Sequence, residues 1–166
     1  SSGWNTTDCK FGGCLKFDDV NDYVSVGSPA SLNFDNRNAL TVMFWMKAEI
    51  AQATYMDPLS WGHSSSHGIV FQSTDNGATL DALIADGTTI PSAGNFGDLR
   101  GTGWRHLVAV KDSTGARIYL DGVLKNSDAG ITAPIKLLSN WEFTVGRDIN
   151  DRYFNGTIDN VKIYQR

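Results

Sequence analysis

The sequence predicts an all-β fold, a two-sheet antiparallel jelly-roll sandwich with little or no helix, and three observations support this prediction. Two alternating apolar–polar runs, at residues 104–110 and 116–120, are separated by a Ser-Thr-Gly turn. The second run is followed by Asp121-Gly122, a dipeptide suited to a two-residue type I′ hairpin turn. Turn signals recur at short intervals, and no segment keeps the 3.6-residue period of an amphipathic helix.

Turn dipeptides divide the preceding part of the chain into short strands. Residues 40–46 are apolar at both alternating positions, as expected of a central strand that is covered on both faces. Asn76-Gly77 and Asp86-Gly87 are turn signals. They separate strands expected at residues 69–71, 80–85 and 88–90. Residues 48–68 and 91–103 lack alternation and are expected to form long loops.

Alternation in the strand at 104–110 assigns its side chains to two faces. One face is expected to hold Trp104, His106, Val108 and Val110, and the other Arg105 and Lys111. We expect His106 to be a buried imidazole with satisfied hydrogen bonds rather than a catalytic one. Trp45 and Trp104 lie inside alternating strands and are expected to be core or sheet-face residues. Trp4 and Trp141 are likewise not taken as candidate binding residues.

Four segments support a family assignment. They read WRHLVAV with ARIYLDGVL at 104–124, LKFDDVNDYV at 15–24, LTVMFWMK at 40–47, and VGRD at 145–148 with YFNGTIDNVKIY at 153–164. In this order they resemble the laminin-G-like domains of the concanavalin A-like lectin/glucanase superfamily. The resemblance spans nearly the whole chain and implies the same sandwich. The resemblance defines the function less closely, because some members of the family bind sugars, some bind proteins, and others have no known ligand.

Length and composition describe one domain of ordinary size. The 166 residues are 41% hydrophobic and 19% charged, with 17 glycines and 4 prolines. The net charge of −4 and the absence of a Lys/Arg cluster argue against nucleic-acid binding. The longest apolar run, at 40–46, is too short to cross a bilayer.

The beginning of the chain carries an expectation of its own. Family members usually open with one further strand, whereas this chain begins at Ser1-Ser2-Gly3 as a trimmed chain does, without a signal peptide. We expect one domain over residues 1–166, excised from a larger protein, with that first strand either missing or dispensable.

Cys9 and Cys14 bracket a Lys-Phe-Gly-Gly loop, in which Gly12 and Gly13 let the backbone turn back on itself. A disulfide across this loop is the first interpretation, and two free thiols are the alternative. A metal or redox pair would need more ligands or a Cys-x-x-Cys spacing. A disulfide implies an exported protein.

Two carboxylates share a face with apolar residues. Asp22 shares a face with Val24, and Asp159 shares one with Val161. An inward carboxylate must be paired, hydrogen-bonded or bound to a cation. We therefore predict a structural Ca²⁺, and the resemblance points the same way, because such domains often hold calcium between their first and last strands. The predicted ligands are Asp18, Asn21, Asp22 and Asp159, with Asp19 nearby. The alternative is a β-bulge at Asp159, or capping by backbone N–H groups.

A second set of residues could bind carbohydrate, because sugars require an aromatic surface and planar polar groups. The candidates are Trp61, His63, Phe96, Arg100, Arg147, Asp148, Asp151, Arg152 and Tyr153, with His67 beside them. For each residue the alternative is structural. Trp61 could cover one end of the core, and the Arg/Asp pairs could be exposed ion pairs of little energetic value.

Enzymatic activity is not expected, although the superfamily includes glucanases. Retaining glycosidases need two carboxylates about 5–5.5 Å apart. The two glutamates, Glu49 and Glu142, lie in no Glu-x-Asp-x-x-Glu motif, and the hydrolase and metalloprotease motifs are absent. Sequons at Asn5 and Asn155 are too short to be decisive.

The sequence therefore predicts a non-catalytic, carbohydrate-binding module of an exported or cell-surface protein. Its partner would be a polysaccharide or other glycan, and neither nucleic acid nor membrane insertion is expected. The alternative is a protein-binding adhesion module with the same fold, whose mark would be an exposed apolar patch.

Overall fold

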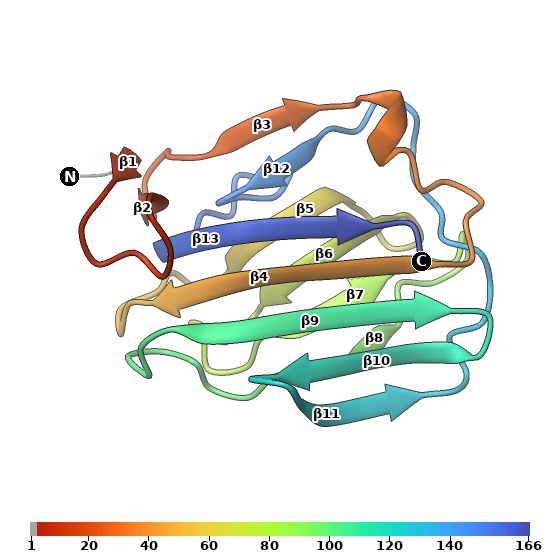
Figure 1. Cartoon of the computed structure of the whole chain (residues 1–166). Helices are drawn as coiled ribbons and strands as arrows, with labels where there is room; N and C mark the ends of the chain where they lie inside the picture. The colour runs from red at the N-terminus through yellow and green to blue at the C-terminus, as the bar shows by residue number, and fades with distance from the viewer. Residues whose placement is uncertain (1–2) are drawn as a thin grey trace.

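The computed structural model describes residues 3–166, and Ser1 and Ser2 lie outside the described residues. Two antiparallel sheets pack face to face (Figure 1). The first has seven strands in the order β1 (Gly3–Asn5), β2 (Cys14–Asp18), β13 (Asn155–Tyr164), β4 (Leu40–Ala48), β9 (Arg105–Asp112), β10 (Gly115–Leu120) and β11 (Val123–Asp128). The second has six, in the order β3 (Val24–Gly27), β12 (Phe143–Val145), β5 (Met56–His63), β6 (Gly68–Ser73), β7 (Asp81–Ile84) and β8 (Ser92–Asn95). A single 3-10 turn, η1 (Ala30–Leu32), is the helical part of the described chain.

The core lies between the two sheets and is built from the inward side chains of both. In β4 burial alternates strictly, with Val42, Phe44 and Met46 facing inward. Phe44 meets Phe71 of β6 edge to face, with ring centroids 5.0 Å apart. These contacts join the centres of the two sheets, so the predicted sandwich with almost no helix is confirmed.

The predicted hairpin is also confirmed. Strands β10 and β11 pair across Asp121-Gly122, and Leu120 lies opposite Val123. Asp121 has φ 52° and Gly122 has φ 81°, and positive φ at both central positions is the mark of a type I′ turn.

The prediction that residues 48–68 and 91–103 form long loops is wrong, because the first range contains strand β5 and the second contains strand β8. Alternation is hidden in β5 because both of its faces are buried and its register shifts twice, between Met56 and Leu59 and between Trp61 and His63. The strand expected at 88–90 is instead a turn. Its backbone N–H groups donate to the Asp86 carboxylate, at 2.8 Å from Thr88 and 2.7 Å from Thr89.

The faces of β9 alternate as predicted, but the buried face is the other one. Leu107, Ala109 and Lys111 face the core, whereas His106 is half-buried on the outer face. His106 lies against the Trp45 ring, with centroids 4.9 Å apart. The outer face of β4 is likewise half-buried rather than covered. Because both faces of these strands carry apolar residues, the sequence pattern did not show which face points into the core.

The predicted disulfide between Cys9 and Cys14 is confirmed, with the two Cα atoms 5.4 Å apart. It closes the loop that joins β1 to β2 at the edge of the seven-stranded sheet.

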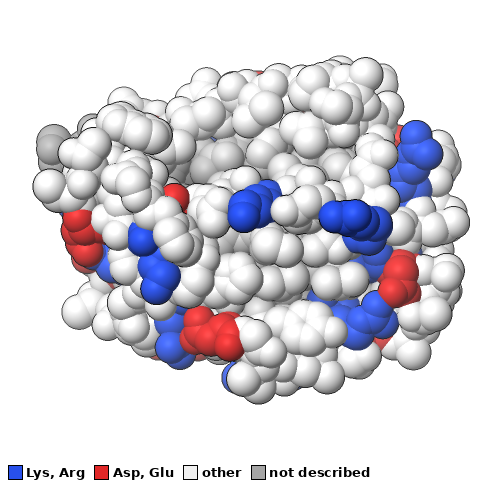
Figure 2. All heavy atoms as spheres, viewed as in Figure 1, with Lys and Arg blue, Asp and Glu red and all other residues white. Residues whose placement is uncertain are grey.

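Charged side chains of both signs are scattered over the outer face of the seven-stranded sheet, without a continuous basic surface (Figure 2). This agrees with the net charge of −4. Within residues 3–166, no helix has the length and apolar character needed to cross a bilayer.

Candidate functional site

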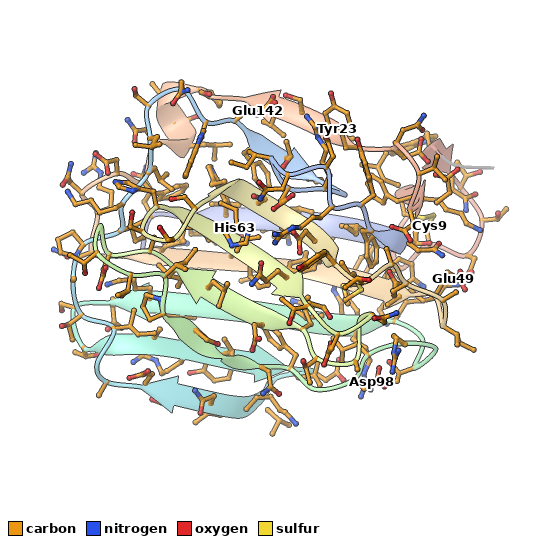
Figure 3. The ribbon with its side chains drawn as sticks, turned by 180° about the vertical axis from the view of Figure 1, so that it is seen from behind. Cys9, Tyr23, Glu49, His63, Asp98 and Glu142 are labelled. Atoms are coloured by element: carbon orange, nitrogen blue, oxygen red, sulfur yellow. A yellow bond between two sulfur atoms is a disulfide. The ribbon has the colours of Figure 1, made fainter. Side chains whose placement is uncertain are left out.

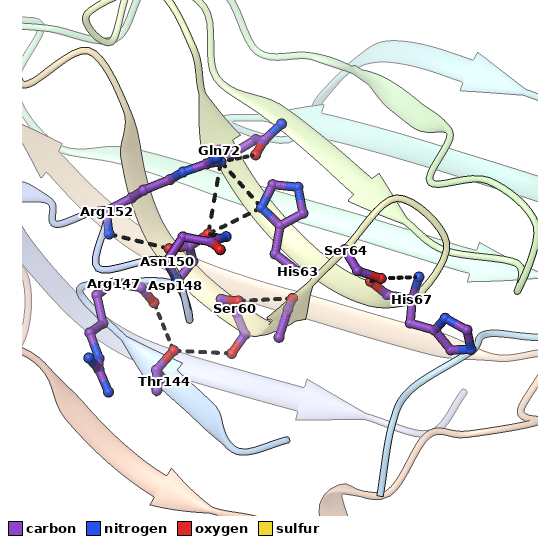
Figure 4. A network of polar contacts seen from close by, with 11 residues as sticks. Ser60, His63, Ser64, His67, Gln72, Thr144, Arg147, Asp148, Asn150 and Arg152 are labelled. Carbon is purple, nitrogen blue, oxygen red and sulfur yellow. Dashed lines mark hydrogen bonds and ion pairs between the residues drawn. The ribbon is translucent and has the colours of Figure 1, made fainter. Parts of the chain in front are cut away.

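A network of polar contacts lies on the outer face of the six-stranded sheet, around His63 (Figures 3 and 4). In β5 the core takes Met56, Leu59 and Trp61. Ser60 lies on the opposite face, and the register shift between Met56 and Leu59 leaves Asp57, the neighbour of Met56, on that face as well. Thr144 of β12 points the same way, and its hydroxyl donates to the Arg147 carbonyl at 2.7 Å. The loop after β12 is thereby held against this face.

Antiparallel pairing explains why distant segments meet here. Strands β3 and β5 flank β12 and run opposite to it. The residues just before β3 and β5 therefore lie beside the residues just after β12. This brings Tyr23 and Tyr55 to the loop that carries Arg147 and Arg152.

Asp148 is the centre of the network and is fully buried. Its Oδ1 accepts hydrogen bonds from the backbone N–H groups of Asn150, at 2.7 Å, and Arg152, at 3.2 Å. Its Oδ2 lies 2.8 Å from the Asn150 amide nitrogen and 3.1 Å from His63 Nδ1. Burial alone would raise the pKa of Asp148, but the hydrogen bonds from His63, Asn150 and Arg152 lower it. Asp148 is therefore an anion held in place by donors.

Asp57 is also fully buried, but its surroundings are opposite in kind. Among residues 3–166, neither of its carboxyl oxygens has a hydrogen-bond partner. Burial raises the pKa of Asp57 well above its usual range, and the charge of nearby Asp148 raises it further, against a smaller lowering by Arg152. Asp57 is thus a carboxyl group that lacks a donor or cation.

His63 joins the two sides of the network. Its Nδ1 lies 3.1 Å from Asp148 Oδ2 and 3.3 Å from Arg152 Nη1. A ring nitrogen either donates to the carboxylate or accepts from the guanidinium, so it cannot satisfy both neighbours at once.

Two tyrosine–arginine stacks flank this network. The Arg147 guanidinium lies 3.6 Å from the centre of the Tyr23 ring, and Arg152 lies 4.0 Å from that of Tyr55. Tyr23 is 42% exposed and Tyr55 is 39% exposed, so each ring still presents surface to solvent. Arg147 is also paired with Asp151 at 2.5 Å, and the Tyr153 hydroxyl donates to the same carboxylate.

The structure brings six of the predicted carbohydrate-contacting residues together: His63, Arg147, Asp148, Asp151, Arg152 and Tyr153. The other three lie elsewhere. Phe96 is buried in the core against Phe71, and Arg100 pairs with Asp98 and the Asn76 carbonyl.

Trp61 belongs to strand β5 rather than to a loop, and it is 3% exposed. It stacks on Phe143 with centroids 4.0 Å apart and meets Phe34 edge to face. The prediction of a loop-borne Trp61 is wrong, and the core role is the one observed. Trp61 and Trp141 both line a cavity of about 290 Å³.

The residues of the calcium prediction do not converge. Strand pairing places Asp18 opposite Asn155, four residues from Asp159 on β13 and so about 13 Å away. Asp159 Oδ2 instead accepts a hydrogen bond from the Phe11 backbone N–H at 2.7 Å. A register shift follows Asp159. Both features match the bulge-and-backbone alternative.

The neighbouring predicted ligands have separate surroundings. Asp18 Oδ1 accepts from the Val20 backbone N–H at 3.2 Å, Asp19 accepts from Ala53, and Asp22 Oδ2 is buried without a partner among the described residues. One ion shared by Asp18 and Asp159 is therefore incompatible with this register. Calcium binding itself stays a prediction.

Five residues of the site were not predicted: Tyr23, Tyr55 and Asp57, together with Gln72 and Asn150, which hydrogen-bond to Arg152 and Asp148. Asp57 had a detectable signal, since it is a lone carboxylate inside the run Met-Asp-Pro-Leu-Ser-Trp. No local signal in the sequence marked the two tyrosines, because their positions in the site depend on strand pairing.

Comparison with known proteins now identifies the family. The family model of the concanavalin A-like lectin/glucanases superfamily, Laminin_G_3, matches residues 18–166. The chain belongs to this family. No curated protein matches this laminin-G-like chain significantly in sequence.

Solved structures agree on the fold. Domain 4 of the extracellular GH43 arabinanase AbnA from Geobacillus stearothermophilus, solved with arabinotriose, has a TM-score of 0.73 at 22% identity, over 99% of this chain and 75% of that one. The binding domain of botulinum neurotoxin serotype D has a TM-score of 0.72 at 16% identity, over 100% and 43%. Domains LG4-5 of the mouse laminin α1 chain have a TM-score of 0.69 at 14% identity, over 99% and 45%. The chain thus spans less than half of the last two.

Proposed function

We propose that this laminin-G-like domain is a non-catalytic carbohydrate-binding module of an exported or cell-surface protein. The observation that carries the proposal is the pair of half-exposed tyrosines, Tyr23 and Tyr55, each backed by an arginine from one loop. Rigid aromatic rings beside planar polar groups suit the apolar faces and hydroxyls of sugar rings.

The surroundings of the two rings supply hydrogen-bonding groups for hydroxyls. Asp151 is exposed and offers acceptor oxygens, and Arg147 and Arg152 offer planar donors. His63 lies beside one of the two stacks, 3.3 Å from the Arg152 guanidinium. Because the opposite charges on this surface nearly balance, a neutral polysaccharide is the preferred ligand class. The arabinotriose held by the Geobacillus domain makes arabinan a useful member of the test panel.

The geometry favours binding over catalysis. Asp57 and Asp148 are near one another but fully buried, so a glycosidic bond cannot reach them. Glu142 accepts from the Ser25 hydroxyl and lies 3.8 Å from Arg147, as a structural carboxylate does. The Cys9–Cys14 disulfide supports export, as does the extracellular origin of the arabinanase domain.

A binding screen with matched tyrosine variants tests the proposal. Wild-type protein is screened by glycan array and by affinity electrophoresis in polysaccharide gels. The double variant Tyr23→Ala/Tyr55→Ala should bind at least about tenfold more weakly, because each ring contributes on the order of 1 kcal/mol. The control is Tyr164→Ala, which removes a tyrosine stacked with Arg166 on the seven-stranded sheet.

Equal loss in the control and the double variant would contradict this location. Failure of the wild type to bind any glycan in the screen would contradict the function. A further variant, Leu138→Arg, blocks the cavity beside Trp61, since the exposed Leu138 lines it. Loss of binding in that variant alone would move the site to the cavity.

A protein-binding role is the second candidate, and one surface favours it. An apolar groove of about 370 Å³ lies along the open side of the sandwich, lined by Trp4, Leu15, Val26, Val161 and Ile163 among others. Trp4 is 72% exposed there. Trp4→Asp abolishing attachment to a host or cell surface, with the tyrosine variants unaffected, would favour adhesion through protein.

A further inference from the structure

Asp57 poses a physical problem that the carbohydrate surface does not solve. Its carboxyl group is fully buried, and no donor among residues 3–166 reaches either oxygen. A buried carboxylate without a partner is costly, so the group must either keep its proton or meet a cation. Arg152 does not fill this role, because its guanidinium contacts His63, Gln72 and the Tyr55 ring instead.

We propose that Asp57, His63 and Asp148 bind one divalent transition-metal ion of the Zn²⁺ class. Their ligand atoms, a carboxylate oxygen from each aspartate and a ring nitrogen of His63, all lie within 4.8 Å of one another. Tetrahedral ligands about 2.0–2.2 Å from a metal are roughly 3.4 Å apart, so small side-chain rotations close the site. The residues come from β5 and from the loop after β12, so the ion joins two distant segments.

Hydrogen bonds already fix the orientation of the first ligand, Asp148. Two backbone N–H groups donate to its Oδ1 and the Asn150 amide donates to its Oδ2, and this Oδ2 also lies 3.1 Å from His63 Nδ1. Hydrogen-bonded carboxylates of this kind orient metal ligands and keep them ionised.

The second and third ligands, Asp57 and His63, each have an atom that is free to bind a metal ion. Both carboxyl oxygens of Asp57 are buried and have no hydrogen-bond partner among residues 3–166, so a divalent ion would supply the partner that they lack. With its proton on Nε2, His63 presents the Nδ1 lone pair to the ion, which removes the conflict between its two neighbours.

The ligand chemistry selects the class of metal. An imidazole nitrogen with two carboxylates suits Zn²⁺ and neighbouring transition metals, whereas Ca²⁺ and Mg²⁺ prefer oxygen ligands throughout. Because Asp57 and Asp148 are fully buried and the His63 side chain is 13% exposed, a substrate cannot reach the ion, which would stabilise the fold rather than catalyse a reaction.

The competing explanation for the buried Asp57 is a proton shared between Asp57 and Asp148. The two explanations predict different responses to added metal ions. Protein without a polyhistidine tag is stripped with a chelator and titrated with ZnCl₂, MnCl₂, CaCl₂ or MgCl₂. Isothermal titration calorimetry gives the stoichiometry, and thermal unfolding gives the stabilisation.

We expect one Zn²⁺ per chain and a Tm rise of several degrees at a hundredfold excess over Kd. Asp57→Asn should lose both effects, because the amide keeps the shape but offers a poor ligand. The control Asp81→Asn removes a carboxylate on β7 that lies outside the cluster, and it should bind as the wild type does.

A wild type that takes up no Zn²⁺, or binding that survives in Asp57→Asn, would overturn the proposal. Asp57→Asn that raises Tm, with no metal effect in the wild type, would establish the shared proton. Ca²⁺ binding with the same dependence on Asp57 would overturn the metal class. No glycan enters these measurements, so the result is independent of carbohydrate binding.

Discussion

Asp57 and Asp148 show how strongly a residue's chemistry depends on its neighbours. Both are fully buried aspartates on the same face of the six-stranded sheet. Asp148 receives three hydrogen bonds from Asn150 and Arg152 and lies beside His63, and its pKa falls, whereas Asp57 receives none from residues 3–166 and its pKa rises. Burial alone therefore does not define the charge of a carboxyl group. The number of donors aimed at it decides.

Trp61→Ala tests the assignment of Trp61 to the core. Its ring packs between Phe143 and Phe34, so truncation should lower the free energy of unfolding by about 3–5 kcal/mol. Urea denaturation followed by far-UV circular dichroism measures the loss. Trp4→Ala is the matched control, because Trp4 is 72% exposed and its removal should cost far less. Similar losses in the two variants would contradict a core role.

His106 should make stability depend on pH. Burial against Trp45 lowers the pKa of His106, Lys162 adds to this effect, and Asp121 opposes it. An unfolded histidine has a pKa near about 6.5, so below that pH the unfolded chain binds the proton more readily than the folded one. The contribution of His106 is therefore complete above about pH 6.5 and is lost as the pH falls through the lowered value.

Unfolding free energies of the wild type and His106→Gln, measured at several pH values, check this prediction. Other groups titrate in the same range, so the difference between the two proteins is the relevant quantity. The wild type should lose more stability on acidification than the variant. Parallel profiles would show that His106 titrates alike in both states.

At the scale of elements, strand β5 carries the site and was hidden in the sequence. Its outer residues are buried beneath the loop that follows β12, so polar and apolar positions are buried alike. Pro58 and Gly62 also obscure the strand pattern in the sequence, and both lie where the register shifts. A strand that is covered on both faces and bulged loses the period of two that identifies strands.

The loop closed by the disulfide is an element whose contribution can be measured. Cys9 and Cys14 close a short loop, and that loop places the Phe11 N–H on the Asp159 carboxylate. Cys9→Ala/Cys14→Ala should lower stability by about 2 kcal/mol, as expected for so small a loop. Thermal unfolding should show a Tm lower by roughly 4–8 °C.

Reduction provides the control for this prediction. A phosphine reductant should lower the wild-type Tm to that of the double variant and leave the variant unchanged. An unchanged wild-type Tm, together with two free thiols titrated in the unreduced unfolded protein, would contradict the bond.

At the scale of the molecule, the candidate site is assembled from three distant segments: the start of β3, strand β5 and the loop after β12. The sandwich places them together because neighbouring strands run antiparallel. The fold is shared with domains from a bacterial arabinanase, a neurotoxin and laminin at 22% identity or less, so it leaves the binding surface free to vary.

The sequence by itself determined the fold class, the type I′ hairpin, the family, the disulfide and six of the residues that gather at the site. These depend on local patterns: alternation, turn dipeptides and the Gly-Gly between two cysteines. Only the tertiary structure decided which face of each strand is buried, that Trp61 packs in the core, and that Asp18 and Asp159 lie apart. It also decided that Tyr23, Tyr55 and Asp57 join the site. Strand register and β-bulges set these outcomes, and a shift of one residue reverses every face, which no local pattern in the chain records.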